Sequence, residues 1–235
     1  MDGRAGKESS IKVSNKTAPP RPAPRLYLAT PVLTDPAPLA AQLPGLLAEA
    51  DVAAVLVRLK ETDPRSMISV VKTLAPAIQG AGAALLIDGH ADLVARSGAD
   101  GAHLNGIAAL DEALPTLRPD RIAGVGGLPT RHDSMNAGER GADYVLFGEP
   151  DAHGRRPAPD AIAERLGWWA ELFEPPCIGY AATHEEAAEF VAAGADFILA
   201  DDLVWQDARG PAAALAELGA AIKAAYTAPT TAAQG

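Results

Sequence analysis

Two cationic side chains stand close together where an apolar stretch of the sequence ends. Arg58 and Lys60 lie at the end of the strand-like run Ala53–Leu59. Residues two apart in a strand share one face, so outward packing of Val57 and Leu59 directs both cations to the same side. Two converging cations suit a diphosphate or a carboxylate. The alternative is that Lys60 simply opens a solvated stretch.

Further polar residues end the next two apolar runs. Asp88 follows the first of them, where its carboxylate can hold a metal ion or orient Lys60. His103 and Asn105 lie two apart in the second and are expected to face the same way. His103 is equally compatible with a buried, hydrogen-bonded histidine of the core. His90 reads as a loop residue, with a ligand role as the less favoured alternative.

Charged residues also follow the later apolar runs. Arg155 and Arg156 belong to a loop, where they can close over an anion or stay solvated. Asp201 and Asp202 end the last run, where a barrel usually binds phosphate, and two carboxylates there oppose an anion. The sequence has no Gly-rich phosphate loop, no nucleophile elbow and no zinc-type Cys/His spacing.

Eight apolar runs must position these residues, and helical patterns separate the runs. The runs are nearly continuously apolar, as expected for strands that are buried on both faces. Eight strand-then-helix units favour a single closed (β/α)8 TIM barrel of the α/β class over an open doubly wound sheet, which stays possible. The predicted strands are Leu26–Ala29, Ala53–Leu59, Ala83–Asp88, Gly101–Asn105, Arg121–Gly126, Tyr144–Glu149, Pro176–Ala181 and Phe197–Asp201.

The tripeptide Gly-Ala-Asp recurs before the fourth, sixth and eighth predicted strands. The copies begin at Gly98, Gly141 and Gly194, and each follows a predicted helix. Each glycine is therefore placed to end that helix in a left-handed conformation. A turn that recurs at alternate strands is expected from duplicated units of a barrel. Because barrel chemistry lies at the opposite strand ends, we interpret the three aspartates as structural.

Length and composition bound the organisation of the chain. The 235 residues suit one barrel over residues 25–226, with a disordered Pro-rich tail at 1–24 and a flexible C-terminus at 227–235. A net charge of −10 argues against nucleic acid and anionic membranes as partners, although a small phosphorylated ligand remains compatible. No apolar run is long enough to cross a membrane, and Cys177 is the single cysteine. A cytoplasmic location is expected.

Together these motifs resemble the thiamine phosphate synthase family and its thiazole tautomerase relatives. The order and spacing of the motifs carry the resemblance, which covers roughly residues 26–205. The motifs are Arg58-Leu59-Lys60, the stretch Asp88–Leu104, Gly124-Val125-Gly126, Gly141–Gly148 and Gly194-Ala195-Asp196. The resemblance implies a (β/α)8 barrel and a transferase reaction. That reaction joins hydroxymethylpyrimidine diphosphate to thiazole phosphate with Mg2+ and releases diphosphate.

The resemblance also implies site residues at the barrel mouth. Arg58 and Lys60 keep the family's diphosphate-binding pair, Arg156 keeps only the cation of its Thr-x-Thr-Lys loop, and Gly179 keeps one glycine of its Gly-Gly-Ile motif. With His103, Asn105 and Arg155 these residues form the predicted phosphate and substrate site, and Asp88 is the candidate Mg2+ ligand.

Other positions depart from the family. The metal aspartate falls on Gly89, the serine of strand five on Gly126 and the phosphate-binding serine after strand eight on Asp202. No carboxylate follows His103-Leu104-Asn105. Two hypotheses therefore stay open. The chain is a synthase with rearranged ligands, or it is a non-catalytic or repurposed barrel that binds another small anion or a protein. A homo-oligomer is compatible with either.

Overall fold

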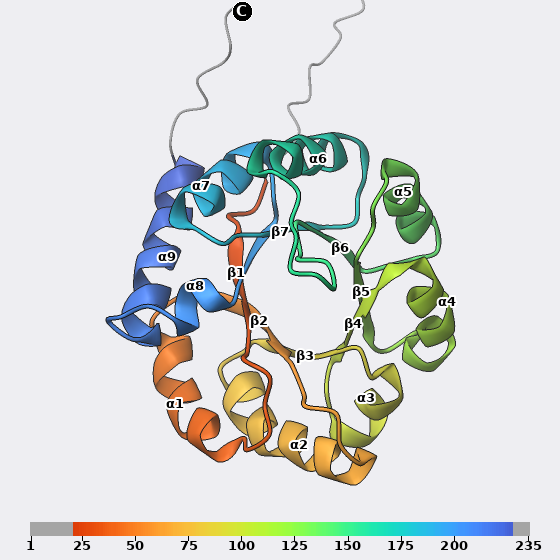
Figure 1. Cartoon of the computed structure of the whole chain (residues 1–235), viewed down its shortest axis with the longest axis vertical. Coiled ribbons are helices and arrows are strands. Elements are labelled where there is room, and N and C mark those ends of the chain that lie inside the picture. Colours follow the sequence, from red (N-terminus) through yellow and green to blue (C-terminus); the bar gives the residue numbers. More distant parts are fainter. Residues whose placement is uncertain (1–20, 228–235) are drawn as a thin grey trace, which may run out of the picture.

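The strands of the protein close into a barrel. The structure, a computed structural model, describes residues 21–227. Within them every strand pairs in parallel with the next, and β1 pairs with β8 (Figure 1). The strands are β1 Arg25–Ala29, β2 Val52–Val57, β3 Ala84–Asp88, β4 Gly101–Asn105, β5 Ile122–Gly126, β6 Tyr144–Phe147, β7 Cys177–Tyr180 and β8 Phe197–Ala200.

Helices form a ring outside the strands, as Figure 1 shows. They are α1 Ala37–Ala48, α2 Pro64–Gly80, α3 Ala91–Ser97, α4 Gly106–Leu117, α5 Arg131–Glu139, α6 Pro159–Leu172, α7 His184–Ala193, α8 Asp202–Trp205 and α9 Pro211–Thr227. The predicted (β/α)8 barrel is therefore confirmed, and the open sheet is not formed. No helix among residues 21–227 is both long enough and apolar enough to span a membrane.

The eight predicted strands all form, with ends that differ by at most two residues, and Gly101–Asn105 has both ends as predicted. The second run stops at Val57, and beyond it Leu59 forms an isolated bridge with Leu33. The predicted disordered tail, residues 1–24, and the flexible C-terminus, 227–235, lie outside the described residues apart from 21–24 and Thr227. Arg21 donates hydrogen bonds to the carbonyls of Gly194 and Ala170.

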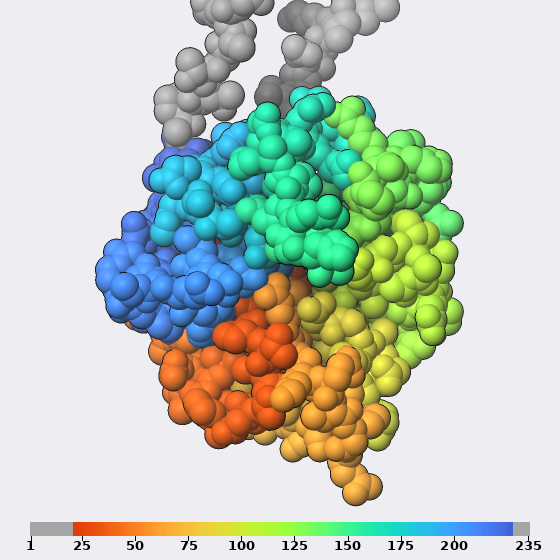
Figure 2. All heavy atoms as spheres, in the orientation of Figure 1, coloured from red at the N-terminus to blue at the C-terminus, as the bar shows by residue number. Residues whose placement is uncertain are grey.

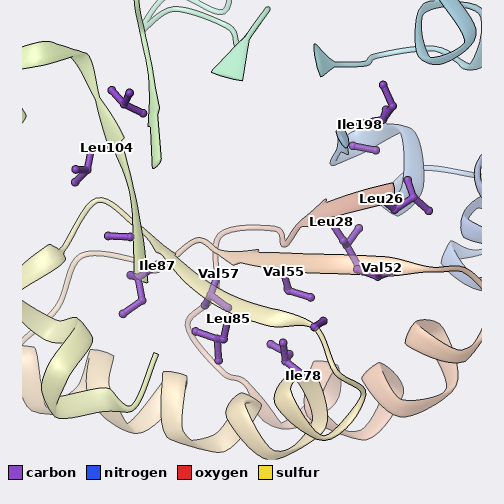
Figure 3. Close-up of a cluster of buried hydrophobic side chains, with 14 of the residues drawn as sticks. Leu26, Leu28, Val52, Val55, Val57, Ile78, Leu85, Ile87, Leu104 and Ile198 are labelled. Atoms are coloured by element: carbon purple, nitrogen blue, oxygen red, sulfur yellow. The ribbon is translucent and has the colours of Figure 1, made fainter. Parts of the chain in front are cut away.

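The core has two layers because side chains of a barrel strand alternate between inside and outside. The outer layer packs strands against helices, and Figure 3 shows part of it, with Leu26 and Leu28 of β1 beside Val55 of β2. The inner layer fills the barrel and consists of Tyr27, Ala29, Leu56, Leu86, Tyr144, Leu146, Ile178, Tyr180 and Leu199.

The single cysteine lies in the outer layer. Cys177 is fully buried in β7, as predicted. Burial raises the pKa of its thiol to about 12. A thiol of that pKa is almost wholly protonated at neutral pH, and the thiolate is the reactive form. Cys177 is therefore inert in the folded protein.

The three Gly-Ala-Asp turns share one hydrogen-bond pattern. Gly98, Gly141 and Gly194 have φ values of 83°, 89° and 105°, the left-handed region that favours glycine. Each aspartate then accepts a hydrogen bond from a backbone N–H of the preceding strand. The pairs are Asp100 with Leu85 at 2.7 Å, Asp143 with Ala123 at 2.7 Å and Asp196 with Cys177 at 2.8 Å. The aspartates thus join neighbouring strands at the amino-terminal end of the barrel, which supports their structural interpretation.

This pattern predicts that Asp196→Ala lowers the free energy of unfolding by about 1–3 kcal/mol, because the N–H of Cys177 loses its side-chain acceptor. Asp120→Ala, at an exposed position, should change it by no more than about 0.5 kcal/mol. Urea unfolding followed by circular dichroism measures both values. Equal stabilities of the two variants would contradict the structural interpretation.

Candidate active site

An arginine lies at the carboxyl end of β2, inside the barrel mouth. Arg58 Nη1 donates to Asp201 Oδ2 at 2.9 Å, and its Nε lies 3.8 Å from Asp88 Oδ2. Tyr180 donates its hydroxyl to the other oxygen of Asp201 at 2.7 Å. Burial lowers the pKa of Arg58, but the hydrogen bond and charge of Asp201 outweigh burial and hold the pKa above its ordinary value. Four strands thus supply one charged cluster: Arg58, Asp88, Tyr180 and Asp201.

Lys60 is not part of that cluster. Its side chain is exposed, and the described part of the chain offers it no carboxylate within 4.0 Å. β2 ends at Val57, so the strand alternation that was expected to aim Lys60 beside Arg58 does not extend that far. The backbone N–H of Lys60 donates instead to the carbonyl of Leu33. A diphosphate role for Lys60 stays a prediction.

A chain of hydrogen bonds crosses the barrel interior. The Tyr27 and Tyr144 hydroxyls lie 3.0 Å apart, and the Tyr144 hydroxyl lies 3.0 Å from His103 Nδ1. His103 Nε2 lies 2.9 Å from Glu149 Oε1. The backbone N–H of Gly127 donates to the other Glu149 oxygen at 3.1 Å. The chain links β1, β6 and β4 and ends at the carboxylate that follows β6.

The protonation states follow from burial. Burial raises the pKa of both Tyr27 and Tyr144, so both hydroxyls keep their protons. Burial lowers the pKa of His103, but the charge and hydrogen bond of Glu149 outweigh burial, and the net pKa is raised. The His103 ring therefore keeps a proton on Nε2 for Glu149. His103 is thus the buried, hydrogen-bonded histidine that the sequence left as an alternative.

Glu149 is the site residue that sequence reasoning missed. A Cβ added to Gly126 would overlap Oε2 of Glu149 and would lie 3.0 Å from His103 Nε2. Glycine at position 126 therefore leaves the room that the carboxylate occupies. The signal was present in the sequence as Gly126 and the glutamate directly after Gly148, but only the fold brings them together.

The loop between β6 and α6 lies over the middle of the barrel (Figure 1), and Figure 2 shows its atoms covering part of the mouth. Arg156 holds this loop in place. It donates to the carbonyls of Gly148 and Tyr180, and it forms an ion pair with Glu186 at 2.8 Å. Arg155 is exposed and pairs with Asp151 of the same loop. In this structure both arginines are paired within the protein rather than free for an anion.

A cavity of about 730 Å³ opens beneath the loop. Asn105 and Glu149 line it, together with the apolar side chains of Leu128, Phe147 and Ile162. Its size and mixed lining are those of a small-molecule site. The predicted residues Asn105, Arg155 and Arg156 therefore meet at one cavity, next to the buried chain that ends at Glu149.

Two other predicted residues lie elsewhere. Gly179 is in β7, where a side chain would meet Phe190 at 2.8 Å and Leu166 at 3.1 Å, so it faces the helices rather than the mouth. Asp88 is at the mouth, and its side chain is 44% exposed. Among the described residues, no three His, Cys, Asp or Glu side chains are grouped to hold a metal ion. The binding role of Gly179 stays a prediction.

A closed parallel barrel with ionisable side chains at the carboxyl ends of its strands defines the (β/α)8 barrel class. Within that class the chain belongs to the thiamine monophosphate synthase family, whose model matches residues 26–200. The resemblance drawn from the motifs is thereby confirmed.

Individual relatives agree with the family. The chain is 40% identical to the thiamine-phosphate synthase of Rhodospirillum centenum over 196 residues, which cover 82% of this chain and 95% of that protein. It is 38% identical to that of Hyphomonas neptunium, over 85% of this chain and 94% of that protein. The thiamine phosphate pyrophosphorylase structure from Pyrococcus furiosus superposes with a TM-score of 0.69 at 21% identity, covering 86% of this chain and 96% of that one.

The different surroundings of the two loop arginines predict different effects of their removal. Arg156→Ala leaves the nearly buried carboxylate of Glu186 without its cation and should lower the free energy of unfolding by about 3 kcal/mol. Arg155→Ala breaks an exposed pair and should cost at most about 1 kcal/mol. Urea unfolding of both variants tests the difference. A neutral Arg156→Ala would mean that Arg156 does not hold the loop.

Proposed function

We propose that this chain is a thiamine-phosphate synthase, which joins hydroxymethylpyrimidine diphosphate to thiazole phosphate and releases diphosphate. The observation that carries the proposal is the 40% identity to a synthase over 95% of that relative's length. The mouth supports it with a cation at Arg58, an open carboxylate at Asp88 and a cavity of about 730 Å³ under the loop between β6 and α6.

Arg58 is our candidate for the diphosphate, although it already pairs with Asp201. A guanidinium has five N–H donors in a fixed fork. Only Nη1 is hydrogen-bonded to Asp201, and Nε lies 3.8 Å from Asp88, beyond hydrogen-bonding length. Donors therefore remain for phosphate oxygens. The Asp201 pair fixes the side chain in the mouth, so little conformational entropy is lost when an anion binds.

Asp88 fits a Mg2+ ion that is shared with the substrate. Its half-exposed carboxylate accepts no hydrogen bond from another described residue, and its nearest cation is 3.8 Å away. Mg2+ commonly binds one or two carboxylates and completes its shell with water and substrate phosphates. Asp88 would hold such an ion, which when bound would neutralise charge on the leaving diphosphate.

We place this synthase in the cytoplasm, with small phosphorylated molecules as ligands and nucleic acid excluded. A net charge of −10 repels polyanions, whereas a few donors such as Arg58 suffice for one diphosphate. The single buried cysteine is compatible with a reducing compartment. A homo-oligomer is compatible with the same proposal.

The direct test is to incubate the purified protein with both phosphorylated precursors and Mg2+ and to measure thiamine phosphate. We expect product, and no product after Mg2+ is chelated. Arg58→Ala should lower kcat/KM by about 100-fold or more, because a donor to the leaving diphosphate is lost. Asp88→Asn should raise the Mg2+ concentration that gives half-maximal rate.

Arg140→Ala serves as the control, because Arg140 pairs with Asp111 on the outer surface. This variant should keep the wild-type rate. An absence of product from the wild-type protein at high concentration, with Mg2+ present, would refute synthase activity and favour a repurposed barrel.

A further inference from the structure

The cavity under the loop combines a carboxylate with apolar walls and with three arginines, Arg155, Arg156 and Arg165, which already donate to other groups of the protein. Leu128, Pro129, Phe147 and Ile162 line it, and Glu149 contributes its carboxylate, with 22% of the side chain exposed. An acceptor-only group beside apolar surfaces suits a flat ring that carries an N–H donor. Because a carboxylate repels a phosphate, the part of the cavity around Glu149 favours such a ring over an anion.

The Glu149 carboxylate is fixed in orientation before any ligand arrives. His103 engages Oε1 at 2.9 Å, and the N–H of Gly127 engages Oε2 at 3.1 Å. His103 is held in turn by Tyr144, and Tyr144 by Tyr27. A carboxylate has about four acceptor positions, so each oxygen keeps one for a ligand. Such preorganisation is typical of groups that set specificity.

The space that Glu149 occupies is reserved for it. Any side chain at position 126 would overlap the carboxylate, and glycine stands there. Gly148, directly before Glu149, has φ 94°, and a Cβ there would lie 2.8 Å from Ile162. Two glycines therefore allow the chain to turn after β6 and to set the carboxylate against β5.

We propose that Glu149 is a specificity-determining residue that accepts hydrogen bonds from the exocyclic amino group of the pyrimidine substrate. His103 acts as a positioning residue through Glu149. The inference rests on the proposed function and adds to it the residue that recognises the pyrimidine ring. The other carboxylate lining the cavity, Asp151, is engaged by Arg155 and by backbone N–H groups of its own loop. Glu149 is therefore the carboxylate left for the ring.

The test measures binding rather than turnover. The probes are unphosphorylated 4-amino-5-hydroxymethyl-2-methylpyrimidine and its 4-oxo analogue, titrated by calorimetry into the full chain without Mg2+. The wild type should bind the amino compound at least about tenfold more tightly, because an oxo group would face the carboxylate without a donor. Glu149→Gln should reduce this preference to about twofold or less.

Asp160→Asn is the matched control, an exposed carboxylate in the first turn of α6 that does not line the cavity. It should keep the wild-type preference. Glu149→Met is a second variant of similar size, and thermal melts verify that each variant folds. Where neither Glu149 variant folds, the wild-type comparison alone decides, and equal binding of the two probes overturns the proposal.

Turnover separates this inference from the proposed function. In a protein that makes thiamine phosphate, Glu149→Gln should raise KM for the pyrimidine diphosphate more than it lowers kcat. A variant that keeps the amino preference but needs more Mg2+ would assign Glu149 to the metal and overturn the inference. A wild type that prefers the amino compound but makes no product would overturn the proposed function alone.

Discussion

The mouth of this barrel is organised around one largely buried carboxylate. A charge removed from water is tolerated only when it is paired and hydrogen-bonded. Glu149 meets that demand with His103 on one oxygen and the N–H of Gly127 on the other. Because His103 must then present Nε2, its Nδ1 needs a partner of its own, which is the hydroxyl of Tyr144. The Tyr144 hydroxyl in turn lies 3.0 Å from that of Tyr27, so the charge of Glu149 orients three further side chains, on β4, β6 and β1.

A second buried pair holds the backbone that carries Glu149. Arg156 donates to the carbonyl of Gly148, the residue before Glu149, and to the carbonyl of Tyr180 in β7. Its partner Glu186 also accepts from the N–H of Ala182, so the pair spans the loops after β6 and β7. The position of Glu149 therefore depends on a contact between two barrel units. Arg156, which the sequence suggested as a cation for an anion, serves first to fix the loop.

Which features could be predicted from the sequence depends on how far apart in the chain the interacting residues lie. The Gly-Ala-Asp turns were predictable because glycine's left-handed preference and the place of each turn are local features. Arg58 was predictable at the mouth because it ends an apolar run. Pairs such as His103 with Glu149 or Arg156 with Glu186 join residues 46 and 30 positions apart, and no local pattern links them. The sequence likewise left His103 undecided, since burial and binding both favour a polar residue there.

Lys60 and Gly179 show a second limit, which is geometric. The inward aim expected for Lys60 assumed that β2 continues to Leu59, but the strand ends at Val57. A glycine that matches a binding motif is compatible with close packing as well, and Gly179 is packed against Phe190 and Leu166. Two residues of strand length, or the side of a strand on which a glycine lacks room for a side chain, decide whether such a residue reaches the site. Neither the length of a strand nor the packing side of a glycine can be predicted from residue type alone.

Hydrogen-bonded pairing also explains how a carboxylate at Asp201 is compatible with an anion-binding mouth. A bare carboxylate after β8 would oppose any phosphate, but Asp201 accepts from Arg58, from Tyr180 and from the N–H of Asp202. Its charge is thus spread over three donors, and Glu149 is offset by His103 in the same way. Asp88, at the end of β3, and the exposed Asp202, after β8, are carboxylates whose side chains accept no hydrogen bond from another described residue. Under the proposed synthase function, a diphosphate that arrives with a divalent cation would meet available carboxylates and one anchored guanidinium, a balance that favours the metal-bound form of the ligand over the bare anion.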